Sequence, residues 1–486
     1  MRWRNLYNSA WSIFDVLLYP SLYLLFTPFL MQQMGEKTYG LWVLVNTIIV
    51  FLQVYNFGLG VNTMRNIAIA IGSGDQRSVP YVLRTNFTLA VLLGLLACCT
   101  GLLLAWATGY FHWLDLPPYL HSPAAVAIGV TGILAGLKFM EMVLVNVLNA
   151  YERIALVARY NTLVRLAGLG IALGLIAAGV GIHYIFLLTI VVYVLGLLLL
   201  FRFVVGSTGP FSLRLLLEKD FVRRELAYSK WIWLQQVLVI LAFQCDKFLA
   251  AYWAGVGEFS YYSIVATIFS HIHLALMAIA PWAMPQITKR LATGTDVTRY
   301  YCSFRSLVHI LAYVGVLFFY LVYRWLFGLW LGEEITAHIA GYLRLYMVFE
   351  LFFVFTIASY FLLNGSGKER LATLNTLVYS LCSLAGLAVG YYYARSIEGM
   401  LQGMIVAMFL SMIVQQWLLS KVLQLGFIRE SLGLLSPMLL LSLFILSEQQ
   451  PVVYRAGLLV ASLLLFIYLY FYIYPVRFRL LQPVTT

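Results

Sequence analysis

The chain has 486 residues, of which 63% are hydrophobic and 10% are charged. Soluble domains carry about 25% charged residues, so a soluble protein, a secreted disulfide scaffold and a disordered chain are excluded. Apolar runs of about 20 residues, instead of short alternating strands, also exclude an outer-membrane barrel. Basic residues number 31 and acidic residues 19. Cytoplasmic loops rich in Lys and Arg explain this excess, so we expect no nucleic-acid partner.

The apolar runs predict an all-α integral membrane protein with about fourteen transmembrane helices. In chain order, the spans cover residues 11–31, 39–61, 85–108, 124–149, 162–180, 183–205, 231–254, 259–285, 306–331, 342–363, 371–392, 398–420, 434–448 and 456–474. The first follows a short basic segment, as a signal peptide does. It contains Asp15 and Pro20 and lacks a small-residue cleavage site, which predicts an uncleaved span.

The distribution of basic residues predicts the orientation. With both termini in the cytoplasm, 24 of the 31 basic residues lie on the cytoplasmic side and five on the opposite side. Such a bias is typical of inner-membrane proteins with this topology.

The longest connection, residues 206–230, contains an amphipathic run and predicts a cytoplasmic linker helix on the membrane surface. It separates an N-lobe of six spans (1–205) from a C-lobe of six spans (231–420). Residues 421–486 then hold spans 13 and 14 and a cytoplasmic tail.

Two internal matches indicate that the lobes are repeats. Leu-Asn, a basic turn and Asn-Thr-Leu-Val occur at 148–164 and again at 363–378. A weaker match relates Gly35–Trp42 to Gly255–Tyr262 at an offset of 220 residues. Parallel repeats of this kind are typical of transporters that work by alternating access.

Three segments carry a family resemblance. Residues 55–65 hold Gly-Leu-Gly before a basic residue, residues 245–262 hold an aspartate followed by a glycine turn and aromatic residues, and residues 364–370 read Asn-x-x-Gly-Lys-x-Arg. With the predicted topology, they resemble the MOP superfamily of flippases and antiporters, and most of all its Wzx-type flippases for O-antigen and related lipid-linked oligosaccharides.

The resemblance implies two pseudo-symmetric lobes and a bacterial inner-membrane location. It implies an undecaprenyl-pyrophosphate-linked oligosaccharide repeat unit as substrate. Membrane lipids, a polymerase and other polysaccharide-assembly proteins are the partners that it implies.

Polar residues recur on single faces of several spans and predict the wall of a cavity. An ionisable residue within a span costs about 2.5–3.5 kcal/mol and usually faces a cavity or a partner. Amide side chains both donate and accept hydrogen bonds, which suits sugar hydroxyls. Hydrogen bonding between helices is the alternative interpretation of these faces. The candidate cavity-lining residues are Asp15, Tyr19, Asn46, Gln53, Lys138, Gln235, Gln236 and Lys247.

Acidic residues within spans are candidates for coupling to a proton or sodium gradient. They are Glu141, Asp246 and Glu350. Glu141 lies three residues after Lys138, so a structural ion pair is the alternative role of these two.

Arg65, Arg84 and Arg165 are candidates for binding a pyrophosphate headgroup, because a guanidinium binds phosphate through two parallel hydrogen bonds. Ordinary cytoplasmic charge bias is the alternative. We interpret His271 and His273 as packing or lining residues. The sequence has no nucleotide-binding or metal-binding signature, so we expect no cofactor.

Two other functions remain open. One is a MATE-like antiporter that exports organic cations in exchange for protons or sodium ions. The other is a membrane enzyme, such as an oligosaccharide polymerase or a lipid-linked glycosyltransferase. Such enzymes usually need a large extracytoplasmic loop, and the predicted loops are short. We therefore expect a transporter and not an enzyme.

Overall fold

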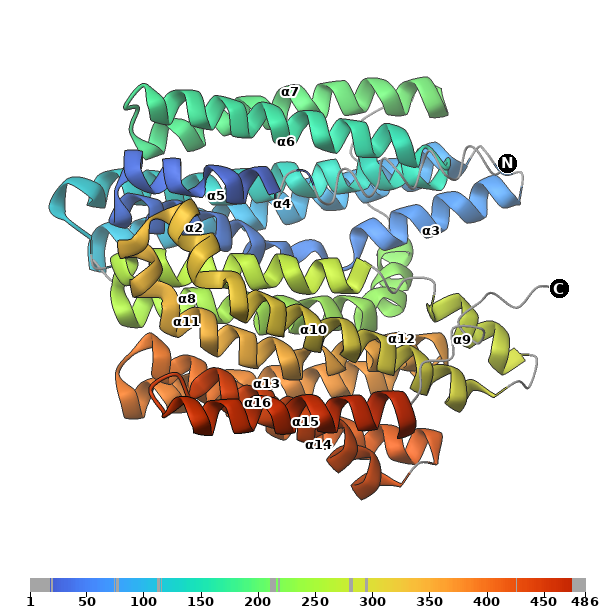
Figure 1. Cartoon of the computed structure of the whole chain (residues 1–486). Coiled ribbons are helices and arrows are strands. Elements are labelled where there is room, and N and C mark those ends of the chain that lie inside the picture. The colour runs from blue at the N-terminus through green and yellow to red at the C-terminus, as the bar shows by residue number, and fades with distance from the viewer. Residues whose placement is uncertain are drawn as a thin grey trace. The chain divides into compact units, whose positions relative to one another are not determined.

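The fold is that of a computed structural model of the whole chain. It describes residue 18 and residues 21–473, except for 74, 76–77, 112–113, 115, 210–215, 217–218, 279–282, 293–295 and 425. These residues form helices joined by short turns and contain no strand, as expected for an all-α protein (Figure 1). Residues 1–260 form one compact unit, and residues 261–486 form a second.

The first unit contains residues 21–34, which are helical, and a series of longer helices. These are α2 (Glu36–Leu52), the 3-10 helix η1 (Gln53–Asn56), α3 (Leu59–Gly72), α4 (Ser78–Phe111), α5 (Pro118–Ala150), α6 (Ile154–Ala177), α7 (Ile182–Thr208) and the first part of α8 (Lys219–Ala278).

The second unit begins within α8. Its other helices are α9 (Ala283–Ala292), α10 (Val297–Leu331), α11 (Glu333–Phe353), α12 (Phe355–Gly365), α13 (Glu369–Ala394), α14 (Ile397–Leu423), α15 (Phe427–Leu446), α16 (Val452–Ile467) and η2 (Tyr468–Ile473). The predicted linker lies partly outside the described residues. From Lys219 onward, helix α8 continues without a break into the predicted seventh span.

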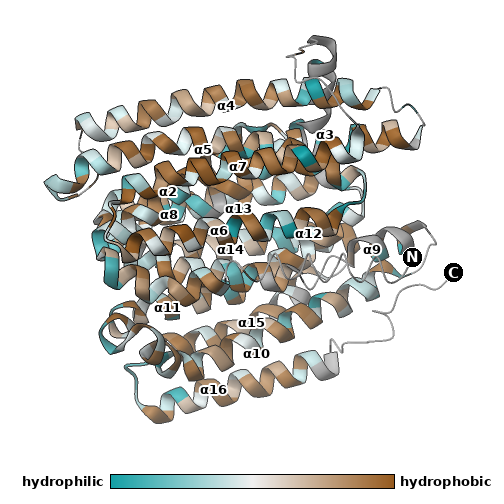
Figure 2. Cartoon of the chain, turned by 90° about the horizontal axis from the view of Figure 1, so that it is seen from above, coloured by the Kyte–Doolittle hydropathy of each residue, from teal (hydrophilic) through white to brown (hydrophobic). Residues whose placement is uncertain are grey.

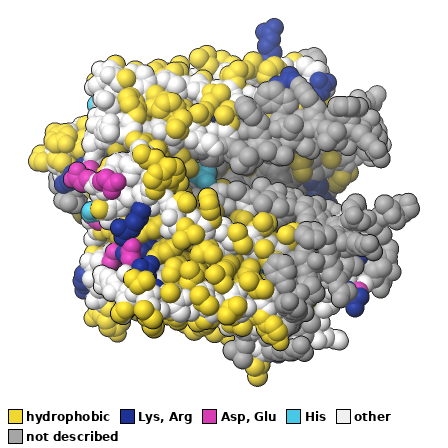
Figure 3. All heavy atoms as spheres, in the orientation of Figure 1, with side chains coloured by type: hydrophobic (Ala, Val, Ile, Leu, Met, Phe, Trp, Pro, Cys, Tyr) yellow, Lys and Arg dark blue, Asp and Glu magenta, His cyan; other side chains and the backbone are white. Residues whose placement is uncertain are grey.

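The helices are long and apolar enough for a multi-pass membrane protein. In the described part of the chain, eleven helices meet both conditions. Figure 2 shows that hydrophobic residues, in brown, predominate along most of the helices. Large apolar side chains on their surfaces face outward, for example Trp325 (68% exposed) and Leu329 (72% exposed). Figure 3 shows hydrophobic side chains over much of the visible described surface. Apolar surface of this extent is stable against lipid and not against water.

Span 2 is broken where the sequence predicted one helix over residues 39–61. Helix α2 ends at Leu52, η1 follows, and Phe57 (φ 47°) and Gly58 (φ 73°) are left-handed before α3 starts. The Asn56 side chain accepts a hydrogen bond from the Gly58 backbone N–H at 2.8 Å. This short-range contact stabilises the turn within the span.

Two turns show that the weaker sequence match reflects backbone geometry. Gly35 (φ 73°, ψ 161°) precedes α2, and Gly255 (φ 82°, ψ 160°) interrupts α8. These conformations are accessible to glycine and strained for other residues. The interruption separates the helical segments that the sequence predicted as spans 7 and 8.

The stronger match also has a common backbone geometry. After α5, Glu152 is left-handed (φ 56°), and the Arg153 N–H donates to the Leu148 carbonyl at 2.9 Å. After α12, Gly367 is left-handed (φ 67°), and the Lys368 N–H donates to the Leu363 carbonyl at 2.9 Å. Equivalent residues are 215 positions apart, so the two turns support an internal repeat.

Glycines allow one helix pair in each unit to pack closely. In the first unit, a Cβ atom on Gly101 of α4 would lie 2.8 Å from the Gly132 backbone nitrogen of α5. In the second unit, a Cβ atom on Gly390 of α13 would lie 2.9 Å from the Gly399 carbonyl carbon of α14. Small residues permit this backbone contact in membranes, where dispersion forces and not hydrophobic burial hold helices together.

Candidate functional site

A cavity of about 530 Å³ lies within the first unit. Helices α2, α5, α6 and α7 supply its walls, together with the first residue of η1. Its polar lining consists of Asn46, Gln53, Lys138, Glu141, Asn146, Asn161, Arg165, Thr189 and Tyr193. Five of these are residues that the sequence singled out, namely Asn46, Gln53, Lys138, Glu141 and Arg165. The structure thus brings together members of all three predicted classes.

Lys138 lies within α5 and points at an aromatic ring. Its ammonium nitrogen is 5.1 Å from the centre of the Tyr193 ring on α7, in the range of a cation–π contact. The negative charge of Glu141 and the positive charge of Arg165 both act on this ammonium. The described side chains of Lys138 and Glu141 form no direct ion pair, although their spacing along the helix permits one. Both charges therefore line the cavity without neutralising each other in direct contact.

The amide side chains of the cavity differ in how they are satisfied. The Asn46 amide N–H donates to the Trp42 carbonyl at 2.8 Å, and the Asn146 amide N–H donates to the Met142 carbonyl at 2.8 Å. Gln53 stands where α2 ends and η1 begins, and its buried Nε2 has no hydrogen-bond partner. A buried donor without a partner costs about 1–3 kcal/mol, so this amide can gain from an acceptor on a bound molecule.

The predicted residues of span 7 lie on α8 and do not line this cavity. They are Gln235, Gln236, Asp246 and Lys247. Gln235 Nε2 and Gln236 Oε1 are buried without a hydrogen-bond partner, and Asp246 is 6% exposed. Nearby, the Trp233 indole N–H donates to the Val54 carbonyl at 2.7 Å, which ties α8 to the break in span 2.

The remaining predicted residues of the first unit are apart from the cavity or outside the described residues. Arg65 on α3 is exposed and Arg84 on α4 is half-buried, and neither contributes to the cavity wall. Only Arg165 of the three candidate headgroup ligands does so. Asp15 and Tyr19 lie outside the described residues.

Glu350 forms a buried pair in the second unit. Its carboxylate lies 2.9 Å from His273 Nδ1, and their side chains are 2% and 6% exposed. The His273 ring also stacks on Phe353, with the ring centres 4.1 Å apart. Glu350 comes from α11 and His273 from the second part of α8. A buried carboxylate beside an imidazole can exchange one proton between two sites.

The sequence did not predict His273 as the partner of Glu350. The two residues are 77 positions apart, and helical periodicity relates only residues on one helix. The available signal was that two ionisable side chains lie deep in predicted spans 8 and 10, where each requires a partner.

No protein-family model matches the chain, and no curated protein matches it in sequence. Solved structures do match its fold. The inward-facing conformation of a multidrug resistance MATE family transporter of the MOP superfamily superposes with a TM-score of 0.65 at 17% identity, covering 85% of this chain and 92% of that one. The outward-facing conformation of such a transporter gives a TM-score of 0.59 at 16% identity, covering 82% and 91%.

A third match is a MOP superfamily transporter from Pyrococcus furiosus, with a TM-score of 0.59 at 16% identity and a coverage of 82% and 91%. Sequence identities this low carry information about the fold and not about the substrate. The chain is an all-α membrane protein with the fold of the MATE transporters of the MOP superfamily.

Proposed function

We propose that the chain is a flippase that moves a lipid-linked oligosaccharide, carried on undecaprenyl pyrophosphate, across the bacterial inner membrane by alternating access. Both termini lie in the cytoplasm in this proposal. The observation that carries it is the composition of the first-unit cavity. Two cationic side chains, Lys138 and Arg165, face one acidic side chain, Glu141, among several amides.

This composition suits the two chemical parts of the proposed substrate. Arg165 and Lys138 can bind the phosphate oxygens through charge-assisted hydrogen bonds. The amides of Asn46 and Gln53 can bind sugar hydroxyls, which also donate and accept. The lipid tail would remain among the acyl chains of the bilayer, so its apolar surface would not be exposed to water.

The second candidate is a MATE-like antiporter of organic cations. The structural similarity to multidrug resistance transporters favours it. The surplus of positive charge in the cavity opposes it, because a cation would be repelled. The Pyrococcus furiosus transporter is described as having a binding pocket of reversed polarity that suggests a different function. Pocket polarity is therefore a reasonable discriminator within this fold.

Energy for transport would come from a proton or sodium gradient. Glu141, Asp246 and Glu350 are the proposed coupling residues, and Glu350 lies in a buried pair with His273. Direct contacts with a polymerase and other polysaccharide-assembly proteins are part of the proposal, since the flipped repeat unit must be passed on.

The test is complementation of a host strain from which the gene has been deleted. We expect the wild-type chain to restore surface glycan and Arg165→Gln to lower it about tenfold, since a lost charged hydrogen bond costs about 1.5–3 kcal/mol. Arg202→Gln is the matched control, because Arg202 is an exposed arginine of α7 outside the cavity. Efflux of ethidium is measured in the same strains.

Two outcomes contradict the flippase. The first is normal surface glycan in the deleted strain, and the second is ethidium efflux that requires the chain. Equal glycan levels with Arg165→Gln and Arg202→Gln would remove the cavity arginine from the mechanism.

A further inference from the structure

A second cavity, of about 560 Å³, lies in the second unit. It is open and is formed by α11, α14, α15, α16 and the turn between the last two. Its polar lining consists of Arg344, Glu398, Gln402, Ser447, Gln449, Gln450 and Tyr454. We call it the outer pocket, because the predicted topology places Arg344 and Arg455 on the side of the membrane opposite the cytoplasm. No residue of the proposed transport site belongs to it.

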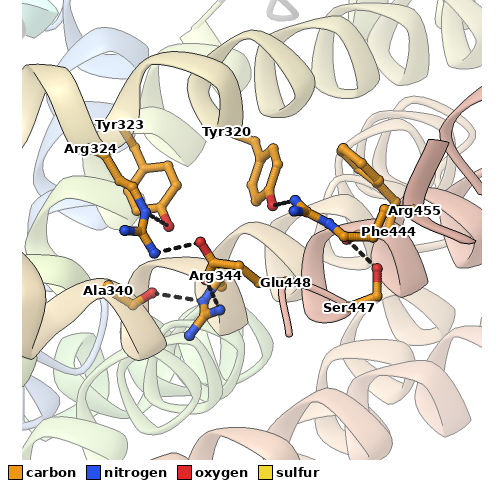
Figure 4. Close-up of polar contacts among 9 residues, drawn as sticks. All are labelled: Tyr320, Tyr323, Arg324, Ala340, Arg344, Phe444, Ser447, Glu448 and Arg455. Atoms are coloured by element: carbon orange, nitrogen blue, oxygen red, sulfur yellow. Dashed lines mark hydrogen bonds and ion pairs between the residues drawn. The ribbon is translucent and has the colours of Figure 1, made fainter. Parts of the chain in front are cut away.

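Ion pairs hold the wall of the outer pocket in place. Glu448, in the turn between α15 and α16, accepts hydrogen bonds from Arg344 of α11 and from Arg324 of α10, as Figure 4 shows. Arg455 of α16 donates to the Tyr320 hydroxyl of α10 at 2.8 Å. These contacts join the α15–α16 turn to two other helices, so the pocket is formed before a ligand arrives. A preformed pocket loses less entropy on binding.

The charges of the outer pocket are balanced. The lining itself holds one guanidinium, that of Arg344, and one carboxylate, that of Glu398. Outside the lining, Glu448 pairs with both Arg344 and Arg324. Glu398 packs against Gly341 of α11, where a larger residue would collide with its carboxylate. A phosphate or carboxylate ligand would have to approach Glu398 and displace Glu448. The pocket therefore disfavours an anion.

The uncharged lining groups match a polyhydroxylated molecule. The amides of Gln402, Gln449 and Gln450 and the Tyr454 hydroxyl each donate and accept hydrogen bonds. The Tyr454 ring and the apolar side chain of Leu446 offer surfaces for the C–H groups of a sugar ring. A volume of this size lies in the range of small-molecule sites.

We propose that the outer pocket binds an uncharged saccharide. In the context of the proposed flippase, on which this role rests, the saccharide is the glycan of the translocated repeat unit on its way out. Binding itself requires only the lining groups. It can therefore be measured without any transport.

The experiment is saturation-transfer NMR on the full chain in lipid nanodiscs. The probes are neutral di- and trisaccharides with glucose, galactose, mannose and N-acetylhexosamine units, and inorganic phosphate is the competitor. We expect at least one saccharide to receive saturation. The variant Gln402→Ala/Gln450→Ala should weaken this binding about tenfold or more, because each lost hydrogen bond costs about 0.5–1.5 kcal/mol. Gln32→Ala, an exposed glutamine of the first unit, is the matched control.

Glu398→Gln separates the saccharide from an anion. It keeps the shape and removes the charge, so saccharide binding should persist, whereas an anion would bind more tightly once this carboxylate is gone. The thermal unfolding temperatures of all variants are compared with that of the wild type to confirm folding. The proposal is overturned if no probe saccharide binds, if the double variant binds like Gln32→Ala, or if phosphate displaces the saccharide.

The two proposals fail separately. If the chain binds saccharide in the outer pocket but does not restore surface glycan, the flippase proposal is contradicted and the pocket proposal stands. If the chain restores surface glycan but shows no saturation transfer, the pocket proposal is contradicted and the flippase proposal stands.

Discussion

Individual side chains within the spans differ in how their charge is balanced. Lys138 faces the Tyr193 ring, which stabilises its ammonium without cancelling its charge. Glu350 is buried against the His273 imidazole, which can neutralise it by carrying a proton. The first arrangement keeps a charge available to a ligand, whereas the second pairs two ionisable side chains away from solvent.

The variant Glu350→Gln tests the second arrangement. An amide still reaches His273 but carries no exchangeable proton, so we expect gradient-driven restoration of surface glycan to fall while folded protein persists. Gln keeps the side-chain shape and an oxygen that can accept from His273, so we expect the variant to fold, and its thermal unfolding temperature is measured because removal of one partner of a buried pair is otherwise destabilising. Glu334→Gln on the same helix is the control, since Glu334 is exposed. Undiminished glycan with Glu350→Gln would exclude this pair from coupling.

Periodicity along one helix placed Asn46 and Gln53 on one face of span 2 and Lys138 and Glu141 on one face of span 4, and all four line one cavity. Their roles in binding and coupling stay predictions. Periodicity can relate the two residues of each pair because they lie one or two turns apart on the same helix. Periodicity left His273 as a packing or lining residue, because its partner Glu350 comes from another helix. The same limit applies to Tyr193, whose position beside Lys138 depends on how α5 and α7 pack.

At the level of elements, apolar runs in the sequence predicted where the spans lie. They did not predict the break within span 2. The continuous run through residues 39–61 predicted one helix, yet η1 and the left-handed Phe57 divide it. The Asn56–Phe57–Gly58 sequence is a local turn signal. A hydrogen bond from Trp233 to Val54, 179 positions apart, also stabilises this turn within the span. A contact of that range is absent from any local pattern.

The close pair α4 and α5 gives a test of packing. Gly101→Leu places a side chain where the Gly132 backbone lies. We expect the free energy of unfolding to fall by about 1–3 kcal/mol, which is measured as a lower thermal unfolding temperature in detergent. Gly174→Leu on α6 is the control, because no atom lies within 4 Å of its added Cβ. Equal unfolding temperatures for the two variants would contradict this packing.

For the whole molecule, the apolar content and the fold agree on a multi-pass membrane protein. The division into lobes at residues 206–230 and the positions of the termini stay predictions. Orientation is the property that composition addresses most directly, because 24 of 31 basic residues fall on one side of the predicted topology.

Cysteine labelling tests this orientation. In a variant without the five native cysteines, Asp220→Cys should be protected from a membrane-impermeant maleimide in intact cells, and Glu334→Cys should react. Both should react after the cells are opened, which serves as the control for accessibility. The reverse pattern would invert the topology.

The close contact of α4 and α5 has a consequence for biosynthesis. Helix α5 carries Lys138 and Glu141 into the bilayer, and each charge opposes insertion by about 2.5–3.5 kcal/mol on translocon scales. Helix α4 is strongly apolar and leaves the ribosome first. Because its glycines let α5 dock backbone to backbone, the two helices can leave the translocon as one hairpin. The small residues of α4 would then lower the cost of inserting the charged residues of α5, because the two helices would already be packed together during synthesis.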